Sequence, residues 1–342
     1  MNSHGIIGGK VWNWISSWLD GRQQRVRMNG IGSAWRRVTS GVPQGSVLGP
    51  ILFLIFINDI DDGLTSEILK FADDTKIFGK SSSPEGRESL QRDTQLLCDW
   101  ARDWQMEFNI GKCKTMHFGT NNVQQDYWMN GQKVEKVTEE RDLGVIISGD
   151  LKVATQCSHA YMKANRMLGL IRRTMSSRDP VILTRLYKSL VRPHLEYCAV
   201  AWSPYYKKDK EKIERVQHRF TRFFKPLREL SYDSRLEKLS LWTLEERRNR
   251  ADLIEVFKMC KGLSSTPLSA FFTRELDSRT RGHAWKLRKQ QSRTDLRQKF
   301  FSNRVINLWN RLTPEAVAVT TVNSFKSHLQ RMRNTRVGFF MD

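Results

Sequence analysis

The sequence of 342 residues has no long apolar run, because its longest, residues 51–57, is far too short to cross a bilayer. It contains no Cys-x-x-Cys pair and no Cys/His cluster with zinc spacing, which excludes the common zinc modules. We expect the five cysteines to be reduced thiols, mostly buried, in a reducing compartment. These are Cys98, Cys113, Cys157, Cys198 and Cys260. No secretory segment opens the chain, so we expect a protein inside the cell, in the nucleus or the cytoplasm, without membrane partners.

Acidic residues are scarce relative to basic ones, and the imbalance is uneven along the chain. The net charge is +21, from 57 Lys and Arg against 36 Asp and Glu. Residues 1–150 carry 17 basic and 19 acidic residues, whereas residues 151–342 carry 40 and 17. A well-solvated helical surface would account for the excess of basic residues in residues 151–342. We favour a nucleic-acid partner, because a charge of this size repels itself unless a polyanion neutralises it.

The first 150 residues alternate between short apolar segments and turn signals. They predict a helix over residues 10–19, strands over 22–39 around Asn29-Gly30, and a hairpin over 127–137 around Asn130-Gly131. They also predict a helix from Ser83-Pro84 and an apolar strand over residues 142–147. The helix expected over residues 51–60 is apolar all round and should be buried. The fold class is therefore α+β, with short, mostly antiparallel strands and helices on one side.

After Asp150 the pattern becomes helical. Helices are expected over residues 152–175, from Asp179-Pro180 to before Pro193, and over residues 207–224 and 244–261. In the third of these, an apolar stripe is opposed by a basic face, which consists of Lys208, Lys212, Arg215, Arg219 and Arg222. Such faces are either solvated or lie along phosphates.

Lys and Arg also recur around four aromatic residues of the C-terminal segment, Trp285, Phe300, Phe301 and Trp309. Basic residues interleaved with aromatic ones suit single-stranded nucleic acid, through phosphate neutralisation and base stacking. The alternative is ordinary packing of a C-terminal segment.

Residues 68–78 read as a hairpin that places Asp73 and Asp74 at a tight turn. Two carboxylates at such a turn can hold Mg²⁺, which takes one or two protein carboxylates and leaves its other positions to water and phosphates. Asp is also a common residue in solvated turns, so this pair by itself is a weak signal.

Residues 40–50 contain two Pro and three Gly and predict an unusual, rigid backbone path into the following helix. Such a loop lets a flat substrate approach the main chain closely. Gln44 is the polar side chain there that could bond to a base or sugar. On the loop alone, a purely conformational turn is the simpler interpretation.

Taken in order, these segments resemble the palm motifs of a reverse transcriptase from a LINE-like, non-LTR retrotransposon of the jockey group. The resemblance rests on Ser40-Gly-Val-Pro-Gln-Gly-Ser-Val-Leu-Gly-Pro-Ile-Leu-Phe, Phe71-Ala-Asp-Asp-Thr, Asn109-x-x-Lys-Cys and Leu143-Gly-Val. The back half resembles the thumb and C-terminal region of the same proteins. The segments concerned are Leu190-Val-Arg-Pro-His-Leu-Glu-Tyr, Lys212-Ile-Glu-Arg-Val-Gln, Thr280-Arg-Gly-His and Trp309-Asn-Arg-Leu.

The resemblance implies a partial right-hand polymerase palm over residues 1–150, a helical thumb-like region over 151–265 and a basic C-terminal region over 266–342. It implies RNA-directed DNA synthesis with Mg²⁺, an RNA template, a DNA primer or target, and deoxynucleoside triphosphates.

The roles of single residues come from the same resemblance. Asp73 matches a metal-binding acid and Asp74 its neighbour, and Lys112 matches the lysine near the departing pyrophosphate. Pro43, Gln44 and Gly45 match the loop against the incoming nucleotide and template. Leu143, Gly144 and Val145 match the turn that grips the primer end.

One departure from the family pattern concerns a second metal-binding Asp, expected on a strand before the Gly-rich loop. The only acid in residues 1–58 is Asp20, in a Trp-Leu-Asp-Gly helix end. We therefore expect an N-terminally truncated polymerase with little or no activity alone, because two metals would lack a bridging carboxylate. The alternatives are a non-catalytic RNA or DNA binder and an unstable relic with exposed apolar edges.

Overall fold

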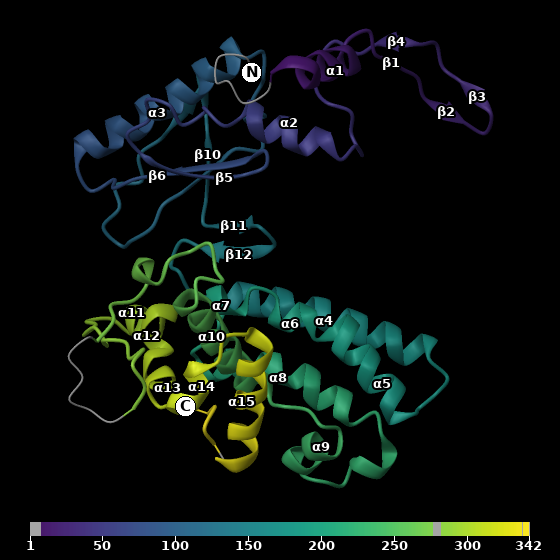
Figure 1. Ribbon diagram of the computed structural model, residues 1–342, viewed down its shortest axis with the longest axis vertical. Helices are drawn as coiled ribbons and strands as arrows, with labels where there is room; N and C mark the ends of the chain where they lie inside the picture. The colour runs from purple at the N-terminus through teal and green to yellow at the C-terminus, as the bar shows by residue number, and fades with distance from the viewer. Residues whose placement is uncertain (1–7, 276–281, 337, 342) are drawn as a thin grey trace. The chain divides into compact units, whose positions relative to one another are not determined.

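The computed structural model describes residues 8–275, 282–336 and 338–341. It divides into two compact units, residues 1–137 and 138–342, which are described separately (Figure 1). Thr280 and Arg281, from one of the motifs above, lie outside the described residues. Within the described residues, no helix is both long and apolar enough to span a membrane.

The first unit combines helices with short strands. The helices are α1 (Gly9–Leu19), α2 (Leu48–Phe56) and α3 (Pro84–Asp103). The strands are β1 (Gln23–Gln24), β2 (Arg27–Met28), β3 (Ile31–Gly32), β4 (Arg36–Arg37), β5 (Glu67–Phe71), β6 (Asp74–Phe78), β7 (Lys114–Met116), β8 (Trp128–Met129), β9 (Gln132–Lys133) and β10 (Glu135–Val137). The strands pair two by two. All these pairs are antiparallel except β7 with β10, which is parallel.

Local turn chemistry explains two of these hairpins. Asn29-Gly30 joins β2 to β3 and Asn130-Gly131 joins β8 to β9, and all four residues have positive φ. This is the backbone that a tight two-residue hairpin loop requires. The start of α3 is equally local, since the Ser83 hydroxyl accepts a hydrogen bond from the Gly86 amide and Pro84 follows. These predictions are confirmed.

The prediction that the apolar helix after the Gly-rich loop is buried all round is wrong. In α2, Gly49 and Leu52 are buried, but the side chains of Ile51 and Leu54 are 50% and 54% exposed. The apolar clusters of this unit are small, and one gathers Ile57, Ile60 and Leu97. An all-apolar pattern indicates that a helix is poorly solvated, but it does not indicate which other segments cover the helix.

The second unit is mainly helical and carries one hairpin, β11 (Glu139–Asp142) with β12 (Val145–Ser148). Its helices are α4 (Ala154–Thr174), α5 (Pro180–Leu186), α6 (Pro193–Glu196), α7 (Ala199–Trp202), α8 (Lys207–Thr221), α9 (Tyr232–Lys238), α10 (Leu244–Cys260), α11 (Asp295–Lys299), α12 (Phe301–Arg304), α13 (Ile306–Asn310), α14 (Pro314–Ala318) and α15 (Val322–Thr335). A π-helical segment, Tyr187–Val191, follows α5. The predicted α+β class is confirmed as helices with small sheets, while the palm, the thumb and the three-part division stay predictions.

The strand predicted over residues 142–147 is instead a hairpin. Leu143 and Gly144 form its turn with φ of 43° and 87°. The sequence Glu-Glu-Arg-Asp of β11 has no apolar residue, so it gives no strand signal of its own.

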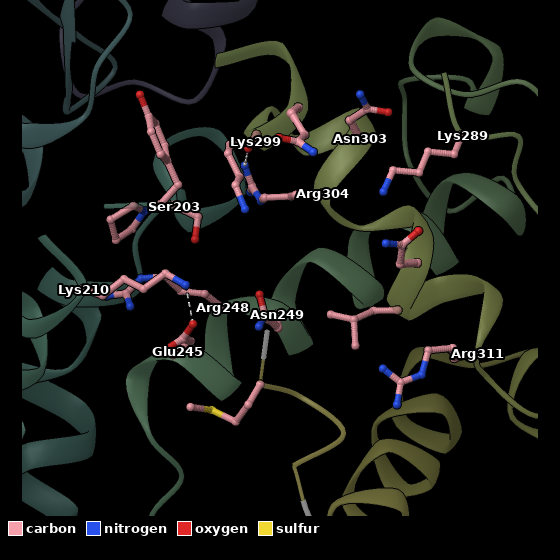
Figure 2. A pocket seen from close by; sticks show the side chains of 16 residues that line it. Ser203, Lys210, Glu245, Arg248, Asn249, Lys289, Lys299, Asn303, Arg304 and Arg311 are labelled. Atoms are coloured by element: carbon pink, nitrogen blue, oxygen red, sulfur yellow. Dashed lines mark hydrogen bonds and ion pairs between the residues drawn. The ribbon is translucent and has the colours of Figure 1, made fainter. Parts of the chain in front are cut away.

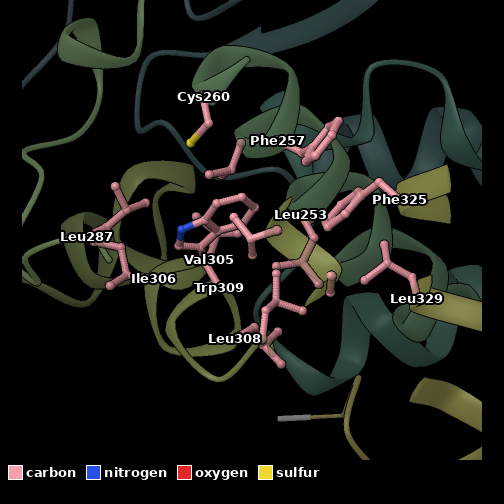
Figure 3. Packing of buried hydrophobic residues seen from close by; sticks show 14 of the residues in the cluster. Leu253, Phe257, Cys260, Leu287, Val305, Ile306, Leu308, Trp309, Phe325 and Leu329 are labelled. Carbon is pink, nitrogen blue, oxygen red and sulfur yellow. The ribbon is translucent and has the colours of Figure 1, made fainter. Parts of the chain in front are cut away.

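Two apolar clusters form the core of the second unit, and α10 contributes to both. One gathers the facing sides of α4 and α8 with the segment Tyr187–Val191, including Leu168, Ile213 and Phe220. The other packs α10 against the C-terminal helices (Figure 3). There the rings of Phe257 and Phe325 stack with centroids 4.3 Å apart.

Charged residues of α10 hold the C-terminal segments as well. Asp252 forms a bidentate ion pair with Arg304, with distances of 2.7 Å and 2.9 Å. Glu246 closes a capping box with Thr243 and receives two hydrogen bonds from Arg333 on α15. Beyond α15, the side chains of Phe339 and Phe340 are 2% and 1% exposed within the second cluster.

The five cysteines are free thiols, as predicted. Cys98, Cys157 and Cys260 are buried, Cys113 is partly buried, and Cys198 is exposed.

Candidate functional site

The Asp73 and Asp74 hairpin forms as predicted. Strands β5 and β6 pair from Glu67 opposite Phe78 to Phe71 opposite Asp74, which leaves Ala72 and Asp73 as the two loop residues. Both carboxylates are exposed. Ala72 has a φ of 52°, a left-handed conformation that costs a side-chain-bearing residue about 1–2 kcal/mol. Backbone strain of this kind is concentrated at functional sites in proteins.

A buried carboxylate that the sequence analysis missed secures the start of this hairpin. Asp93, on α3, is fully buried and accepts hydrogen bonds from the Ser66 amide at 2.7 Å and the Thr65 amide at 3.1 Å. Burial acts to raise the pKa of Asp93, but the hydrogen bonds from Ser66 and Thr65 outweigh it and leave the pKa below its ordinary value of 3.8. Its helical position gave no sign of this partner, which lies 27 residues away in the sequence.

A side chain within the Gly-rich loop stabilises the conformation of the loop. The Ser46 hydroxyl donates to the Pro43 carbonyl at 2.7 Å and accepts from the Gly49 amide at 3.0 Å. A Cβ at Gly49 would lie 2.9 Å from the Pro43 carbonyl oxygen, so only glycine fits there. Gly45 has a φ of 81°. The Gln44 side chain is exposed and accessible to a ligand.

Lys112 lies in a tight turn. Its amide donates to the Asn109 carbonyl at 2.8 Å, and the Cys113 amide bonds to the same carbonyl at 3.2 Å. The Lys112 side chain is exposed. The turn explains the spacing of the Asn-x-x-Lys-Cys pattern, because Asn109 supplies the carbonyl that closes it.

In the second unit, the turn of Leu143, Gly144 and Val145 is held by a residue that sequence reasoning did not single out. The Tyr197 hydroxyl donates to the Leu143 carbonyl at 2.9 Å, and a Cβ at Gly144 would lie 3.3 Å from the Tyr197 ring. The C-terminal residue of the segment Leu190-Val-Arg-Pro-His-Leu-Glu-Tyr thus fixes the Leu-Gly-Val turn. The Val145 side chain is buried in the core.

A cavity of about 300 Å³ adjoins this turn. Gly144 and Tyr197 line it together with the cations Arg141 and Lys163 and with His159. Burial, and then the charges of Lys163 and Arg141, lower the pKa of His159, which favours its neutral form. The cavity therefore combines positive charge with a neutral imidazole that can donate or accept a hydrogen bond.

The basic face predicted for α8 is largely at the surface. Lys208, Arg215 and Arg222 are exposed, whereas Lys212 donates to the Ser158 hydroxyl at 2.6 Å and Arg219 to the Asn165 side chain at 2.9 Å. Exposed charges on one helix face are available to a polyanion.

Of the two interpretations of the C-terminal aromatic residues, ordinary packing rather than base stacking holds for two of the four. Phe301 and Trp309 are 4% and 0% exposed and belong to the core, while Trp285 is partly buried and Phe300 is 45% exposed. Buried rings cannot stack on a strand of nucleic acid without unpacking the core.

The predicted site residues fall into both units. Asp73, Asp74, Lys112 and the loop of Pro43, Gln44 and Gly45 belong to the first, whereas Leu143, Gly144 and Val145 belong to the second. No hydrogen bond or ion pair within the described part of the chain joins the Asp73–Asp74 turn to Lys112 or to the Gly-rich loop.

Groups of three or more metal-ligating side chains are also absent from the described residues. The two adjacent carboxylates fit a single Mg²⁺ that shares its coordination with water and phosphate oxygens. They do not fit a pair of metals bridged by protein carboxylates.

In a comparison with known families, residues 4–169 match the model described as "Reverse transcriptase (RNA-dependent DNA polymerase)". This part of the chain, just under half of its length, is therefore similar to the reverse transcriptase family. The matched residues include the Gly-rich loop, the Asp73–Asp74 hairpin, Lys112 and the turn at Gly144.

Similar curated proteins are named as RNA-directed DNA polymerases, or probable ones, of mobile elements. The chain is 31% identical over 210 residues to the RNA-directed DNA polymerase from mobile element jockey of Drosophila funebris, covering 56% of the chain and 22% of that protein. It is 26% identical over 196 residues to the jockey polymerase of Drosophila melanogaster, covering 54% and 21%. It is 24% identical over 218 residues to the probable RNA-directed DNA polymerase from transposon X-element of the same fly, covering 61% and 24%.

The predicted resemblance to jockey-type reverse transcriptases is thereby confirmed. The chain spans less than a quarter of the length of these relatives. No solved structure matches it.

Proposed function

We propose that this reverse-transcriptase segment binds an RNA template and a DNA primer or target, and that it carries part of the centre for RNA-directed DNA synthesis. The observation that carries this proposal is the family match over residues 4–169, which contains the motifs in their expected order. In this proposal residues 1–150 act as palm, 151–265 as thumb and 266–342 as a basic C-terminal region. The excess of basic residues after residue 150 supports contact with nucleic acid.

Within this proposal, Asp73 is a metal-binding acid, Asp74 assists it, and Lys112 neutralises charge at the departing pyrophosphate. Pro43, Gln44 and Gly45 form the surface for the incoming deoxynucleoside triphosphate and the template. The exposure of both carboxylates and of the Lys112 and Gln44 side chains supports these roles, because each must reach a ligand. Bound Mg²⁺ would supply charge stabilisation for nucleotidyl transfer.

A separate role falls to the turn of Leu143, Gly144 and Val145, which we propose holds the primer end. Its rigidity supports the role, since Tyr197 bonds to the Leu143 carbonyl and packs closely against Gly144.

We infer that the chain alone polymerises weakly or not at all, because no third metal-ligating side chain groups with Asp73 and Asp74 within the described residues. The test is primer extension by the purified chain on an RNA template annealed to a DNA primer, with Mg²⁺ and deoxynucleoside triphosphates. Asp73→Asn is compared with Asp62→Asn, which removes an exposed acid elsewhere in the same unit.

Little or no extension is expected, and any residual extension should disappear in Asp73→Asn and persist in Asp62→Asn. Vigorous synthesis that depends on Asp73 would contradict the inference that the chain alone is weakly active. Synthesis that is unchanged by Asp73→Asn would contradict the role of Asp73.

A second candidate function is a non-catalytic RNA or DNA binder, which the 40 Lys and Arg of residues 151–342 favour. It predicts binding that weakens steeply with salt, because each neutralised phosphate releases counterions. Both candidates predict that Asp73→Asn binds nucleic acid as well as the parent chain does. They differ in that only the first predicts any Asp73-dependent extension.

A further inference from the structure

A basic cavity lies in the second unit, and none of the predicted site residues lines it. Its volume is about 360 Å³, and α8, α10 and the segment between residues 289 and 311 line it (Figure 2). Of its lining side chains, six are Lys or Arg and one is acidic, Glu245. The basic residues are Lys210, Arg248, Lys289, Lys299, Arg304 and Arg311.

Two of these six cations form an ion pair with an acid of the described structure. Lys210 pairs with Glu245 at 2.5 Å, and Arg304 pairs with the buried Asp252. Lys289, Lys299 and Arg311 are exposed and make no ion pair with any described residue. Figure 2 shows Lys210 and Glu245 on one side of the cavity and Lys289 and Arg311 on the opposite side. The cavity thus keeps a surplus of positive charge, which includes the wall formed by Lys289 and Arg311.

Arg248 makes this cavity unusual, because it is a buried cation whose donors are not satisfied. Its side chain is 3% exposed, and its Nε and Nη2 atoms have no hydrogen-bond partner in the described structure. Its guanidinium lies 5.8 Å from the centroid of the Trp202 ring. Buried guanidinium groups normally have an anionic or carbonyl partner, since an unpaired buried charge is costly. Burial lowers the pKa of Arg248, and the charges of Glu214, Glu196 and Glu245 oppose that shift, as an anion in the cavity would.

The other lining residues fit a nucleotide better than a bare ion. Tyr205 offers an aromatic ring, and the side-chain amides of Gln298 and Asn307 make no hydrogen bond to a described residue. Aromatic stacking and free amides are the contacts that bases and sugars use, and a volume of this order suits a small ligand.

We propose that this cavity binds a phosphate group of a nucleotide unit, with Lys289, Lys299 and Arg311 as rim ligands and Arg248 as a buried positive charge on the cavity wall. The group is carried by a single strand of nucleic acid or by a free nucleotide, which share this chemistry. The strand-bound form rests on the proposed nucleic-acid binding function. The free-nucleotide form does not.

The rim double variant Lys289→Gln/Arg311→Gln tests the proposal in the full chain. The matched control is Lys225→Gln/Lys238→Gln, which removes the same charge from exposed positions outside the cavity. Binding to a fluorescent single-stranded oligonucleotide is measured by anisotropy over a series of salt concentrations. The rim variant should lose about tenfold or more in affinity, and its salt slope should fall by about 1.4, the value for two lost phosphate contacts on a single strand. The control should lose less than about threefold.

A second arm measures binding of deoxyadenosine triphosphate and of inorganic pyrophosphate by calorimetry. If the strand binds equally well to both double variants, the cavity does not hold the strand. Nucleotide binding that is lost only in the rim variant would then assign the cavity to free nucleotides. If neither ligand distinguishes the two variants, the proposal is overturned.

Failure of the parent chain to bind any strand would refute the proposed function. The calorimetric measurement with deoxyadenosine triphosphate and pyrophosphate would still show whether the cavity binds a free nucleotide. Arg248→Met provides a further check, because an apolar side chain of similar length should preserve the fold while it removes the buried positive charge. A folded Arg248→Met chain, judged by its melting temperature, that binds both ligands like the parent would also overturn the proposal.

Discussion

The ion pair between Asp252 and Arg304 should be among the costliest contacts to break in the second unit. The two side chains are 2% and 15% exposed, and both guanidinium–carboxylate distances are below 3 Å. Asp252→Ala leaves the Arg304 charge in a poorly hydrated place, for which we expect a loss of about 3–5 kcal/mol in the free energy of unfolding. An exposed pair contributes only about 0–1 kcal/mol.

Local hydrogen exchange is the appropriate assay, because a chain of two units need not unfold in one step. Protection of α10 and α12 should fall by the expected free energy in Asp252→Ala. The double variant Asp252→Leu/Arg304→Met should recover much of the loss, since an apolar pair of similar volume often replaces a buried ion pair at little cost. Glu211→Ala serves as control, because Glu211 and Lys207 form an exposed pair 3.9 Å apart. A loss below about 1 kcal/mol in Asp252→Ala, equal to the control, would refute the reasoning.

Three further predictions concern backbone conformation and pH. Gly144→Ala should destabilise the second unit by about 1–2 kcal/mol, because φ at Gly144 is 87° and the new Cβ would contact the Tyr197 ring. Gly169→Ala should stabilise the same unit by about 0.5–1 kcal/mol, because Gly169 lies in helix α4 and a Cβ there would meet no other atom. Urea unfolding of the two variants should shift in opposite directions. Ala72→Gly should stabilise the β5–β6 hairpin by roughly 0.5 kcal/mol, because glycine adopts the left-handed conformation of residue 72 without strain. Hydrogen exchange of the hairpin amides should then be slower. Burial lowers the pKa of His283 from its ordinary 6.5, so the unfolded chain takes up this proton first and stability should fall as the pH drops below 6.5. The urea midpoint should show this fall, and His283→Gln should make it shallower.

The parts of the fold that were predictable from the sequence are those set by local chemistry. Asn29-Gly30 and Asn130-Gly131 specify their hairpins through positive φ, and Ser83-Pro84 specifies the start of α3, without help from distant residues. The exposure of α2 could not be predicted in this way, because it depends on which other segments cover an apolar helix. The hairpin β11–β12 escaped notice because its first strand is entirely polar.

The candidate site residues also differ in whether local sequence alone reveals them. Asp73, Asp74, Gln44 and Lys112 are recognisable because each lies within a short motif. Tyr197 was not recognisable, because it meets Leu143 across 54 residues of sequence. The basic cavity was likewise hidden, since its lining comes from segments between residues 203 and 341 that only folding brings together.

The burial of Phe339 and Phe340 has a practical consequence for anyone who handles this polypeptide. The Phe340 carbonyl accepts a hydrogen bond of 2.7 Å from the Asn249 side chain, so the backbone is tied down as well as the rings. Carboxypeptidase digestion should stall at this point, unlike at a frayed end. An affinity tag fused after the exposed Met341 would begin one residue beyond the buried rings, so a flexible spacer or a tag at the opposite end is the better choice for purification.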